Sequence, residues 1–344
     1  MGATVEVDRL TKSFGRQNIW KNVSLTLPPG EISALLGPSG TGKSVFLKTV
    51  IGLIRPERGS VHVDGVDTVS CSERELQEVR KRFGVLFQDG ALFGSLNLYD
   101  NIAFPLREHT RKTETEIRRV VEEKMELVGL GGEGAKVPGQ ISGGMKKRAG
   151  LARALVLEPE IILVDEPDSG LDPVRTSYLA QTFVDLNAEL DMTILIVTHN
   201  IELARRLPDN LGMLFSRELV MFGPREVMLT SDEPVVQQFL NGRRVGPIGM
   251  SEEKDAATAA LEAELLQGDN EEDVRGLVPQ MTPSHGLPAR AGGERRTRRV
   301  MAGLHELPPR VREEILAAAP PAEAARWRAI SAVATSGAGL GGLT

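Results

Sequence analysis

Cysteine and long hydrophobic runs are almost absent from this chain. Cys71 is the only cysteine among 344 residues, which excludes an internal disulfide framework and fits a reducing compartment. The longest aliphatic stretches, such as IILV (161–164) and ILIV (194–197), are far too short to cross a bilayer. The first residues also lack the apolar segment of a signal peptide. We therefore expect a protein that stays in the cytosol and reaches a membrane only through a partner.

A surplus of positive charge is missing as well. The formal net charge is −6, whereas general nucleic-acid binding usually shows as a basic imbalance or stripe. We therefore expect no nucleic-acid partner. The chain does have 41% apolar residues, enough for a large core, and its length favours roughly two domains or one large domain with an appendage.

The two parts of the chain differ in composition. Residues 1–244 alternate short β-branched strands with helical patterns, which predicts an α/β domain with a largely parallel sheet. Residues 245–344 are rich in Ala, Gly, Pro, Arg and Glu, with an acidic stretch at 251–273 and a basic one at 289–299. Such a low-complexity extension is expected to bury little, so we predict short helices joined by disordered segments.

A phosphate-binding motif lies early in the chain. GPSGTGKS follows an apolar strand pattern and precedes an amphipathic helix pattern, which is the context that a P-loop requires. Its backbone N–H groups would surround the phosphates, while Lys43 contacts the β- and γ-phosphates and the Ser44 hydroxyl binds Mg²⁺. A chance glycine-rich turn is the alternative, and the flanking strand and helix argue against it. The residues of the loop are Gly37, Pro38, Ser39, Gly40, Thr41, Gly42, Lys43 and Ser44.

A second motif, EIILVDEPDSGLDP (160–173), predicts a buried parallel strand that ends in two carboxylates. Asp165 suits a Mg²⁺ ligand, as in Walker B strands. Glu166 follows it, where a carboxylate polarises a water in line with the γ-phosphate, and is the candidate general base. A strand that ends in Asp-Glu usually just meets solvent, but the upstream P-loop favours the catalytic interpretation.

Two further polar residues follow predicted strands. Gln88 comes at the end of FGVLFQ (83–88), and His199 comes at the end of MTILIVTH (192–199). A polar cap at a strand end is the more common role for such residues. Both nevertheless lie at the sheet edge where parallel-sheet ligands bind. We therefore interpret Gln88 as a ligand and sensor of Mg²⁺ and water, and His199 as a sensor of the γ-phosphate.

A second phosphate-binding element is ISGGMKKRAGLARAL (141–155). Ser142, Gly143 and Gly144 precede a good helix-forming sequence. Small residues at this position let a ligand approach free N–H groups at the positive end of a helix dipole. The chain thus has two predicted phosphate-binding elements, the P-loop and residues 141–155, and the second is expected to bind a different phosphate from the first.

In order and spacing, these motifs resemble those of ATP-binding-cassette (ABC) ATPase subunits over about residues 5–240. The matching motifs are Walker A, the Q-loop Gln88, the signature ISGGM, the Walker B strand, the D-loop SGLD (169–172) and the H-loop His199. The resemblance implies an α/β, RecA-like P-loop core with an N-terminal antiparallel β subdomain and a helical subdomain inserted at about 89–156. It also implies ATP and Mg²⁺ as cofactors and a head-to-tail homodimer, in which the signature of one subunit contacts the γ-phosphate held by the other.

Two positions depart from the family pattern. The signature has Met145 where Gln is usual, and Phe14 stands where an aromatic residue, often Tyr, stacks on adenine. Phe keeps the stacking surface and loses only the hydroxyl. The alternative is that Phe14 is a core aromatic residue on a β-strand.

The subtype follows from absences and from one longer stretch. There is no second cassette, no long heptad coiled coil and no membrane span, which leaves a separate transporter ATPase. LFQDGALFGSLNLYDNIAFPLREHT (86–110), together with ISGGM and DEPDSGLDP, resembles the ATPases of Mla and Mce lipid-transport systems. The long C-terminal extension resembles the actinobacterial Mce form.

This resemblance implies a peripheral motor subunit on the cytoplasmic face of the inner membrane. Such a subunit drives movement of a lipid, such as a fatty acid, sterol or phospholipid, through a YrbE/MlaE-type permease and Mce proteins. The alternative is a cytosolic regulatory or assembly ATPase without a transport substrate. The apolar residues 91–106 either form the groove for a permease coupling helix or pack inside the helical subdomain, and we expect both roles.

The extension carries three local patterns. Residues 307–320 have prolines at both ends and place Val311, Ile315 and Leu316 on one face, which predicts a short helix that needs a docking surface. Residues 233–246 are expected to lie on the ATPase fold and to help hold the dimer. The basic run from Arg290 to Arg299 is either a solvated linker or a contact with anionic lipid headgroups.

Overall fold

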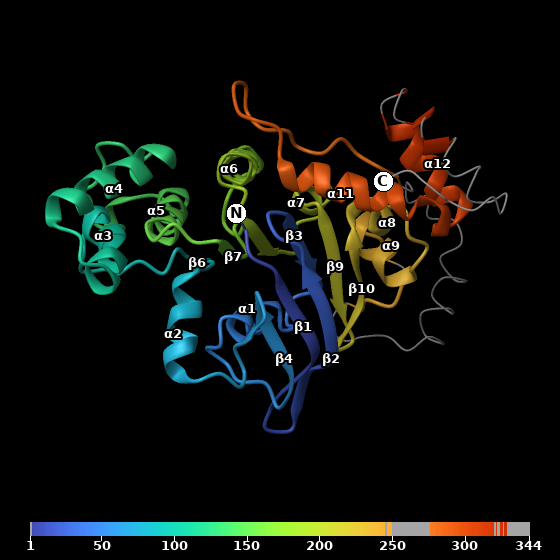
Figure 1. Ribbon diagram of the computed structural model, residues 1–344, viewed down its shortest axis with the longest axis horizontal. Helices are drawn as coiled ribbons and strands as arrows, with labels where there is room; N and C mark the ends of the chain where they lie inside the picture. Colours follow the sequence, from blue (N-terminus) through green and yellow to red (C-terminus); the bar gives the residue numbers. More distant parts are fainter. Residues whose placement is uncertain are drawn as a thin grey trace.

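Two β-sheets form the centre of the computed structural model, which describes residues 2–244, 246–249, 276–319, 321, 324, 325, 327 and 328 (Figure 1). The first sheet is antiparallel, with the strand order β2–β1–β4–β5. Its strands are β1 (Val5–Phe14), β2 (Gln17–Leu27), β4 (Arg58–Val63) and β5 (Val66–Asp67). Buried and exposed residues largely alternate along β1 and β2, as in a sheet that packs one face on the core. This is the predicted antiparallel β subdomain.

The second sheet has the order β10–β9–β3–β8–β7–β6 and is parallel except for β10, which pairs antiparallel with β9 at the edge. Every residue of β3, β7 and β8 is buried, because a parallel sheet is covered on both faces. The carboxyl ends of β3, β6, β7 and β8 therefore meet at one edge. The strands are β3 (Ile32–Leu36), β6 (Phe83–Leu86), β7 (Ile161–Asp165), β8 (Thr193–Val197), β9 (Asn210–Phe215) and β10 (Glu218–Pro224).

Helices cover both faces of the parallel sheet. Helix α1 (Lys43–Val50) lies between the two sheets, where Phe46 packs with Trp20 of β2 and with Leu163 of β7. Helix α6 (Pro173–Leu190) covers the opposite face, and its Phe183 packs with Ile194 of β8. Helix α1, which follows the P-loop, is thus packed between the two sheets, and α6 lies on the far face of the parallel sheet.

A helical group lies to one side of the sheets (Figure 1). It consists of α3 (Leu98–His109), α4 (Glu114–Leu127) and α5 (Gly143–Leu155). Side-chain caps begin all three helices: Asn97 accepts from Asp100 N, Thr113 forms a capping box with Glu116, and Ser142 accepts from Met145 N. This group is the predicted inserted helical subdomain. Helix α2 (Glu73–Lys81) precedes β6.

Helices α7 (Ile201–Arg206), α8 (Arg225–Leu229) and α9 (Pro234–Asn241) complete the core beside β9. Val235, Val236 and Leu240 of α9 are buried, so residues 233–241 lie on the ATPase fold as predicted. Their role in holding a dimer stays a prediction. No described helix is long and apolar enough to cross a membrane.

The described part of the extension forms α11 (Ala291–Ala302) and α12 (Pro309–Ala318). Val311, Ile315 and Leu316 of α12 are buried on one face, as predicted, and pack with Val300 and other residues of α11. The acidic stretch at 251–273 lies outside the described residues.

The structure corrects the interpretation of the basic run. Residues 291–299 belong to α11, which lies against the core, and Arg290 and Arg296 are buried there. The run is therefore a docked helix and not a solvated linker, although Arg298 and Arg299 remain exposed on its outer side. Contact of these two residues with anionic lipid headgroups stays a prediction. The physical reason is that two carboxylates of the core face the helix: Arg290 and Arg296 pair with Asp209, and Arg299 pairs with Glu31.

Candidate nucleotide-binding site

The P-loop connects the carboxyl end of β3 to α1. Gly42 is the N-cap of α1 and has a φ of 86°, a left-handed conformation that favours glycine. A Cβ at this position would lie 2.3 Å from Ile19 Cγ2. No side chain caps the first turn of α1, so its N–H groups and the positive end of the helix dipole are available to an anion.

Lys43 folds back over this loop. Its Nζ donates to the carbonyl oxygens of Gly37 at 2.8 Å and Pro38 at 3.0 Å. Burial lowers the pKa of Lys43, and the negative charges of Glu166 and Asp165 oppose that effect. A cation held among backbone dipoles in this way is suited to exchange carbonyl oxygens for phosphate oxygens.

Ser44 of the P-loop and Asp165 of the Walker B strand, both predicted Mg²⁺ ligands, are in direct contact. Ser44 Oγ donates to Asp165 Oδ1 at 2.8 Å. Burial raises the pKa of Asp165, and the hydrogen bond from Ser44 opposes that shift. A hydroxyl beside a desolvated carboxylate fits Mg²⁺, which takes one or two protein oxygens and completes its shell with water and phosphate.

Glu166 and His199 meet at the same edge of the sheet. Glu166 Oε1 lies 3.3 Å from His199 Nδ1, and the backbone N of Glu166 donates to Val197 O at 2.9 Å. Glu166 has a φ of 44°, which is uncommon for a residue with a side chain. The structure thus places the candidate base and the candidate phosphate sensor in contact.

Gln88 reaches the D-loop rather than the Ser44–Asp165 pair. Its Nε2 donates to Ser169 Oγ at 3.1 Å. Gln88 follows β6, whereas Ser169 follows β7, so the contact bridges neighbouring strand ends. Its assignment as a Mg²⁺ ligand stays a prediction.

Lys147 is a residue of this site that the sequence analysis missed. It lies on α5, is buried, and its Nζ donates to the carbonyl oxygens of Glu166 at 3.3 Å, Pro167 at 2.8 Å and Ser169. Burial lowers the pKa of Lys147, and Asp168 leads the charges that oppose this. Lys147 therefore connects the signature helix to the segment that carries the candidate base.

A sequence signal for Lys147 exists. Lys147, Leu151 and Leu155 follow at i, i+4 spacing, so the lysine occupies a core position of the helix. A second missed pair is Thr198 and Asp168, whose buried side chains are joined by a hydrogen bond of 2.8 Å from Thr198 Oγ1. This bond connects the ends of β7 and β8 just behind Glu166 and His199.

The signature residues begin α5. Ser142 caps the helix, and Gly143 and Gly144 are its first residues. In the described part of the chain, no hydrogen bond joins these three residues to the P-loop. A cavity of about 400 Å³ beside them is lined by Leu171, Tyr178 and other residues of the α4, α5 and α6 region.

Phe14 ends β1 and is 48% exposed, so it is not a core aromatic residue. Lys12 Nζ lies 5.0 Å from its ring centroid. The neighbouring strand β2 reaches the P-loop, because Trp20 Nε1 donates to Gly42 O at 3.3 Å. Phe14 is thus an exposed ring in the subdomain that borders the loop, and its stacking on adenine stays a prediction.

The apolar stretch after Gln88 divides into buried and exposed residues. Leu98, Ile102 and Leu106 are buried in the helical group. Phe93 and Phe104 remain 45% and 39% exposed, and their ring centroids are 5.0 Å apart. The predicted mixture of packing and exposure is present, and the exposed pair is the candidate surface for a coupling helix.

Comparison with known proteins adds independent findings. A family profile described as ABC transporter matches residues 20–169. The chain is 65% identical over 320 residues to the probable ribonucleotide transport ATP-binding protein mkl of Mycobacterium tuberculosis, covering 92% of this chain and 89% of that protein. It is 42% identical over 244 residues to the intermembrane phospholipid transport system ATP-binding protein MlaF of Haemophilus influenzae, covering 71% and 92%.

A solved structure agrees with these relatives. The dimeric, ADP- and phosphate-bound ATP-binding cassette MJ0796 matches with a TM-score of 0.60 and 31% identity, over 64% of this chain and 98% of that one. The match to mkl is longer than residues 1–244, so it extends into the C-terminal extension.

Proposed function

We infer the function of this chain from one premise: it belongs to the ABC transporter ATPases of the Mce and Mla type. It is accordingly an ATP-hydrolysing, ATP-binding subunit of an ABC transporter. We propose that it drives lipid movement through a YrbE/MlaE-type permease that works with Mce proteins, and that this permease holds it at the cytoplasmic face of the membrane.

The proposed ATPase site uses the residues described above. The N–H groups of the P-loop and Lys43 hold the phosphates, and Phe14 stacks on the adenine. Mg²⁺ held by Ser44, Asp165 and Gln88 would neutralise phosphate charge as it develops. Glu166 accepts a proton from the attacking water, and His199 positions Glu166 and the γ-phosphate.

The proposed site is complete only in a homodimer. Ser142, Gly143 and Gly144 make no hydrogen bond to the P-loop of their own chain within the described residues. Their helix N-terminus is suited to a phosphate, and we assign to them the γ-phosphate bound by a second copy. Val174 and Tyr178 of α6, which are 65% and 74% exposed beside the D-loop, suit a surface that another subunit covers.

The exposed Phe93–Phe104 pair carries the proposal of coupling to a permease. Phe93 lies in the segment between Gln88 and α3, Phe104 lies on α3, and Arg153 of α5 lies 6.0 Å from the Phe93 ring. An exposed aromatic pair on the helical group that carries the signature helix is a suitable anchor for an amphipathic helix of a membrane protein. The lipid cargo itself rests on similarity to MlaF, because an ATPase subunit does not contact the cargo.

A second candidate cargo is a ribonucleotide, because the mkl relative is named a probable ribonucleotide transport ATP-binding protein. The two cargoes are separable by ATPase stimulation of the purified complex with lipid vesicles or with ribonucleotides. A regulatory or assembly ATPase without a transport substrate is the remaining alternative, and neither addition would stimulate it.

Affinity purification from membranes tests the transport proposal. We expect the full chain to retain a permease and Mce proteins, identified by mass spectrometry. Phe93→Ser combined with Phe104→Ser should lose the permease. Leu53→Ser, a matched change at a residue that is 56% exposed elsewhere, should keep it. A stable complex without any membrane protein would contradict the proposal.

A further inference from the structure

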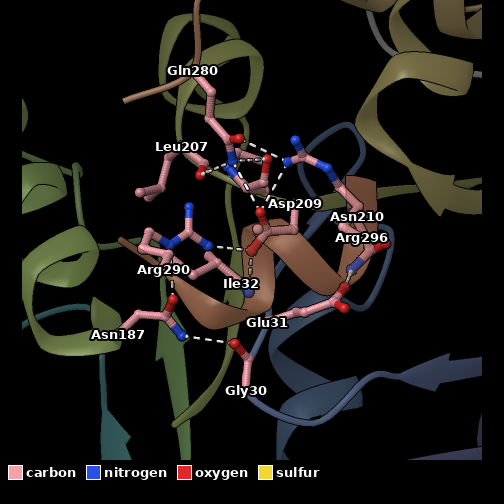
Figure 2. Close-up of polar contacts among 12 residues, drawn as sticks. Gly30, Glu31, Ile32, Asn187, Leu207, Asp209, Asn210, Gln280, Arg290 and Arg296 are labelled. Atoms are coloured by element: carbon pink, nitrogen blue, oxygen red, sulfur yellow. Dashed lines mark hydrogen bonds and ion pairs between the residues drawn. The ribbon is translucent and has the colours of Figure 1, made fainter. Parts of the chain in front are cut away.

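Helix α11 crosses the edge of the parallel sheet that lies opposite the nucleotide site. Glu31 precedes β3, Asp209 precedes β9, and Thr193 begins β8, so these residues mark the amino ends of the strands. Figure 2 shows Arg290 and Arg296 directed at Asp209 from this side. The extension therefore contacts the core at the amino ends of the strands, away from the candidate phosphate site at their carboxyl ends.

The core presents two fully buried carboxylates at this edge. The side chains of Asp209 and Glu31 are 0% exposed. Asp209 pairs with Arg290 and with Arg296, whose Nη1 lies at 2.9 Å from Oδ1. Glu31 pairs with Arg299. In the described part of the chain, every cation that forms an ion pair with these two carboxylates comes from residues 290–299.

Neutral contacts complete the same cluster. Gln280 Nε2 donates to Asp209 Oδ1 at 3.1 Å and to Pro208 O at 2.9 Å. Arg290 Nε donates to Asn187 Oδ1 at 2.7 Å, and Asn187 in turn donates to Gly30 O (Figure 2). A buried carboxylate that loses its cationic partner costs several kcal/mol, because the charge stays desolvated and unpaired. Asp209 and Glu31 are buried with α11 in place, so removing a single arginine while α11 stays docked leaves a carboxylate without its cation.

The backbones of α11 and the core also fit closely. A Cβ at Gly292 would lie 2.0 Å from Gly30 O, so only glycine permits this approach. Gly293, the next residue on the same helix, is different. A Cβ there would lie no nearer than 3.8 Å to another atom, which is ordinary contact. The contact is thus specific in shape as well as in charge.

The segment that leads into α11 is attached to α6 and α7. Met281 N donates to Arg206 O at 2.9 Å. Gln181 Nε2 donates to Thr282 O at 2.9 Å, and Ser284 Oγ donates to Asp185 Oδ2 at 2.7 Å. Residues 280–299 therefore connect both helices that flank β8 to the amino ends of the strands.

We propose that Glu31, Asp209, Asn187 and Gly30 form an acidic socket whose partner is the arginine-bearing helix α11 of the same chain. The socket makes residues 280–302 a part of the ATPase fold, so the core and the described extension unfold as one cooperative unit. The change in composition at residue 244 is then no boundary of the folding unit.

The two tryptophans of the chain can report separately on the two parts. Trp20 is fully buried in the core, whereas Trp327 packs against the cluster that α11 and α12 form. In the full-length chain, Trp327→Phe leaves the core reporter and Trp20→Phe leaves the extension reporter. Urea unfolding followed by fluorescence should show one transition in each protein, and two glycine variants are then compared within each background.

Gly292→Ala should lower the urea midpoint of both reporters, because its Cβ cannot coexist with Gly30 O. Gly293→Ala should leave both midpoints unchanged or raise them, since alanine is the better helix former. Helix propensity alone would predict the same sign for both variants. A lowered midpoint in Gly292→Ala alone therefore reports on docking.

Arginine variants provide a milder second comparison. Arg296→Gln should lower both midpoints, whereas Arg298→Gln, at an exposed position of the same helix, should not. If Gly292→Ala and Arg296→Gln shift only the Trp327 transition and leave the Trp20 midpoint in place, the extension is a separable appendage and the proposal is wrong.

Discussion

Ser44 and Asp165 are 121 residues apart in the chain, and their side chains are joined by a hydrogen bond of 2.8 Å. Ser44 is the second residue of α1, and Asp165 is the last residue of β7. The bond brings a hydroxyl and a desolvated carboxylate to one point beside the P-loop, where a divalent cation needs oxygen ligands. The contact thus joins the P-loop helix to the strand that leads to the candidate base.

Replacing the candidate base should separate binding from hydrolysis. We expect Glu166→Gln to retain ATP binding and to lower turnover by at least ~10², because an amide cannot accept the proton of the attacking water. Phosphate release and equilibrium nucleotide binding measure the two effects. Glu189→Gln, at an exposed position of α6, should change neither. Turnover near the wild-type rate in Glu166→Gln would exclude Glu166 as the base.

Asp165 predicts a pH dependence of stability without nucleotide. Burial raises the pKa of Asp165, so the folded state holds this proton more tightly than the unfolded chain. The resulting stabilisation is present below the ordinary pKa of an aspartate and is lost as pH rises through the raised value. Asp165→Asn removes this loss, so the variant should gain thermal stability relative to wild type at pH 7.5 compared with a pH below the ordinary aspartate pKa of about 3.9. An equal difference at both pH values would contradict the shift.

The composite site predicts complementation between two inactive variants. Ser142→Arg should place a bulky charge at the dimer contact and abolish hydrolysis, while the P-loop still binds nucleotide. Lys43→Ala should instead weaken nucleotide binding, because a charge-assisted contact to the phosphates is lost. Mixed dimers contain one intact site and should recover part of the ATPase rate. If mixed dimers form but stay inactive, the two sites are either obligatorily coupled or not shared between subunits.

Lys147 is expected to position the candidate base through its backbone. Lys147→Met keeps most of the side-chain volume and leaves the carbonyl oxygens of Glu166, Pro167 and Ser169 without this donor. We expect kcat to fall with a smaller change in nucleotide affinity. Lys146→Met is the neighbouring control and should retain activity. A loss confined to nucleotide binding would contradict a positioning role.

Phe14 is expected to contribute by stacking alone. Phe14→Ala should weaken ATP binding by a factor of roughly 2 to 10, which corresponds to the ~0.5–1.5 kcal/mol of an aromatic pair. Phe14→Tyr keeps the ring and should bind ATP as the wild type does. Competition with triphosphate lacking a base separates stacking from a general loss of affinity, since Phe14→Ala should bind that competitor normally.

Local sequence predicted which residues of the candidate nucleotide site come together, because its motifs are short; their roles stay predictions. The P-loop, the strand before it and the helix after it are adjacent in the chain, so their geometry follows from near neighbours. Glu166 and His199 were also predictable as partners of one edge, since both follow apolar parallel strands. The helical spacing marks Lys147 as a core position but does not name its acceptors, because these are backbone carbonyls nineteen to twenty-two residues away.

The sequence by itself determined which elements form and what chemistry they carry, because turns, caps and strand patterns depend on residues close together in the chain. Only the tertiary structure decided the role of Arg290, Arg296 and Arg299. From the sequence alone, a basic run is expected to be exposed to solvent. The fold brings Glu31 and Asp209, which are more than eighty residues away in the chain, into contact with these arginines. Burial depends on the whole arrangement of strands, and once a carboxylate is desolvated, pairing with a cation dominates all weaker local preferences.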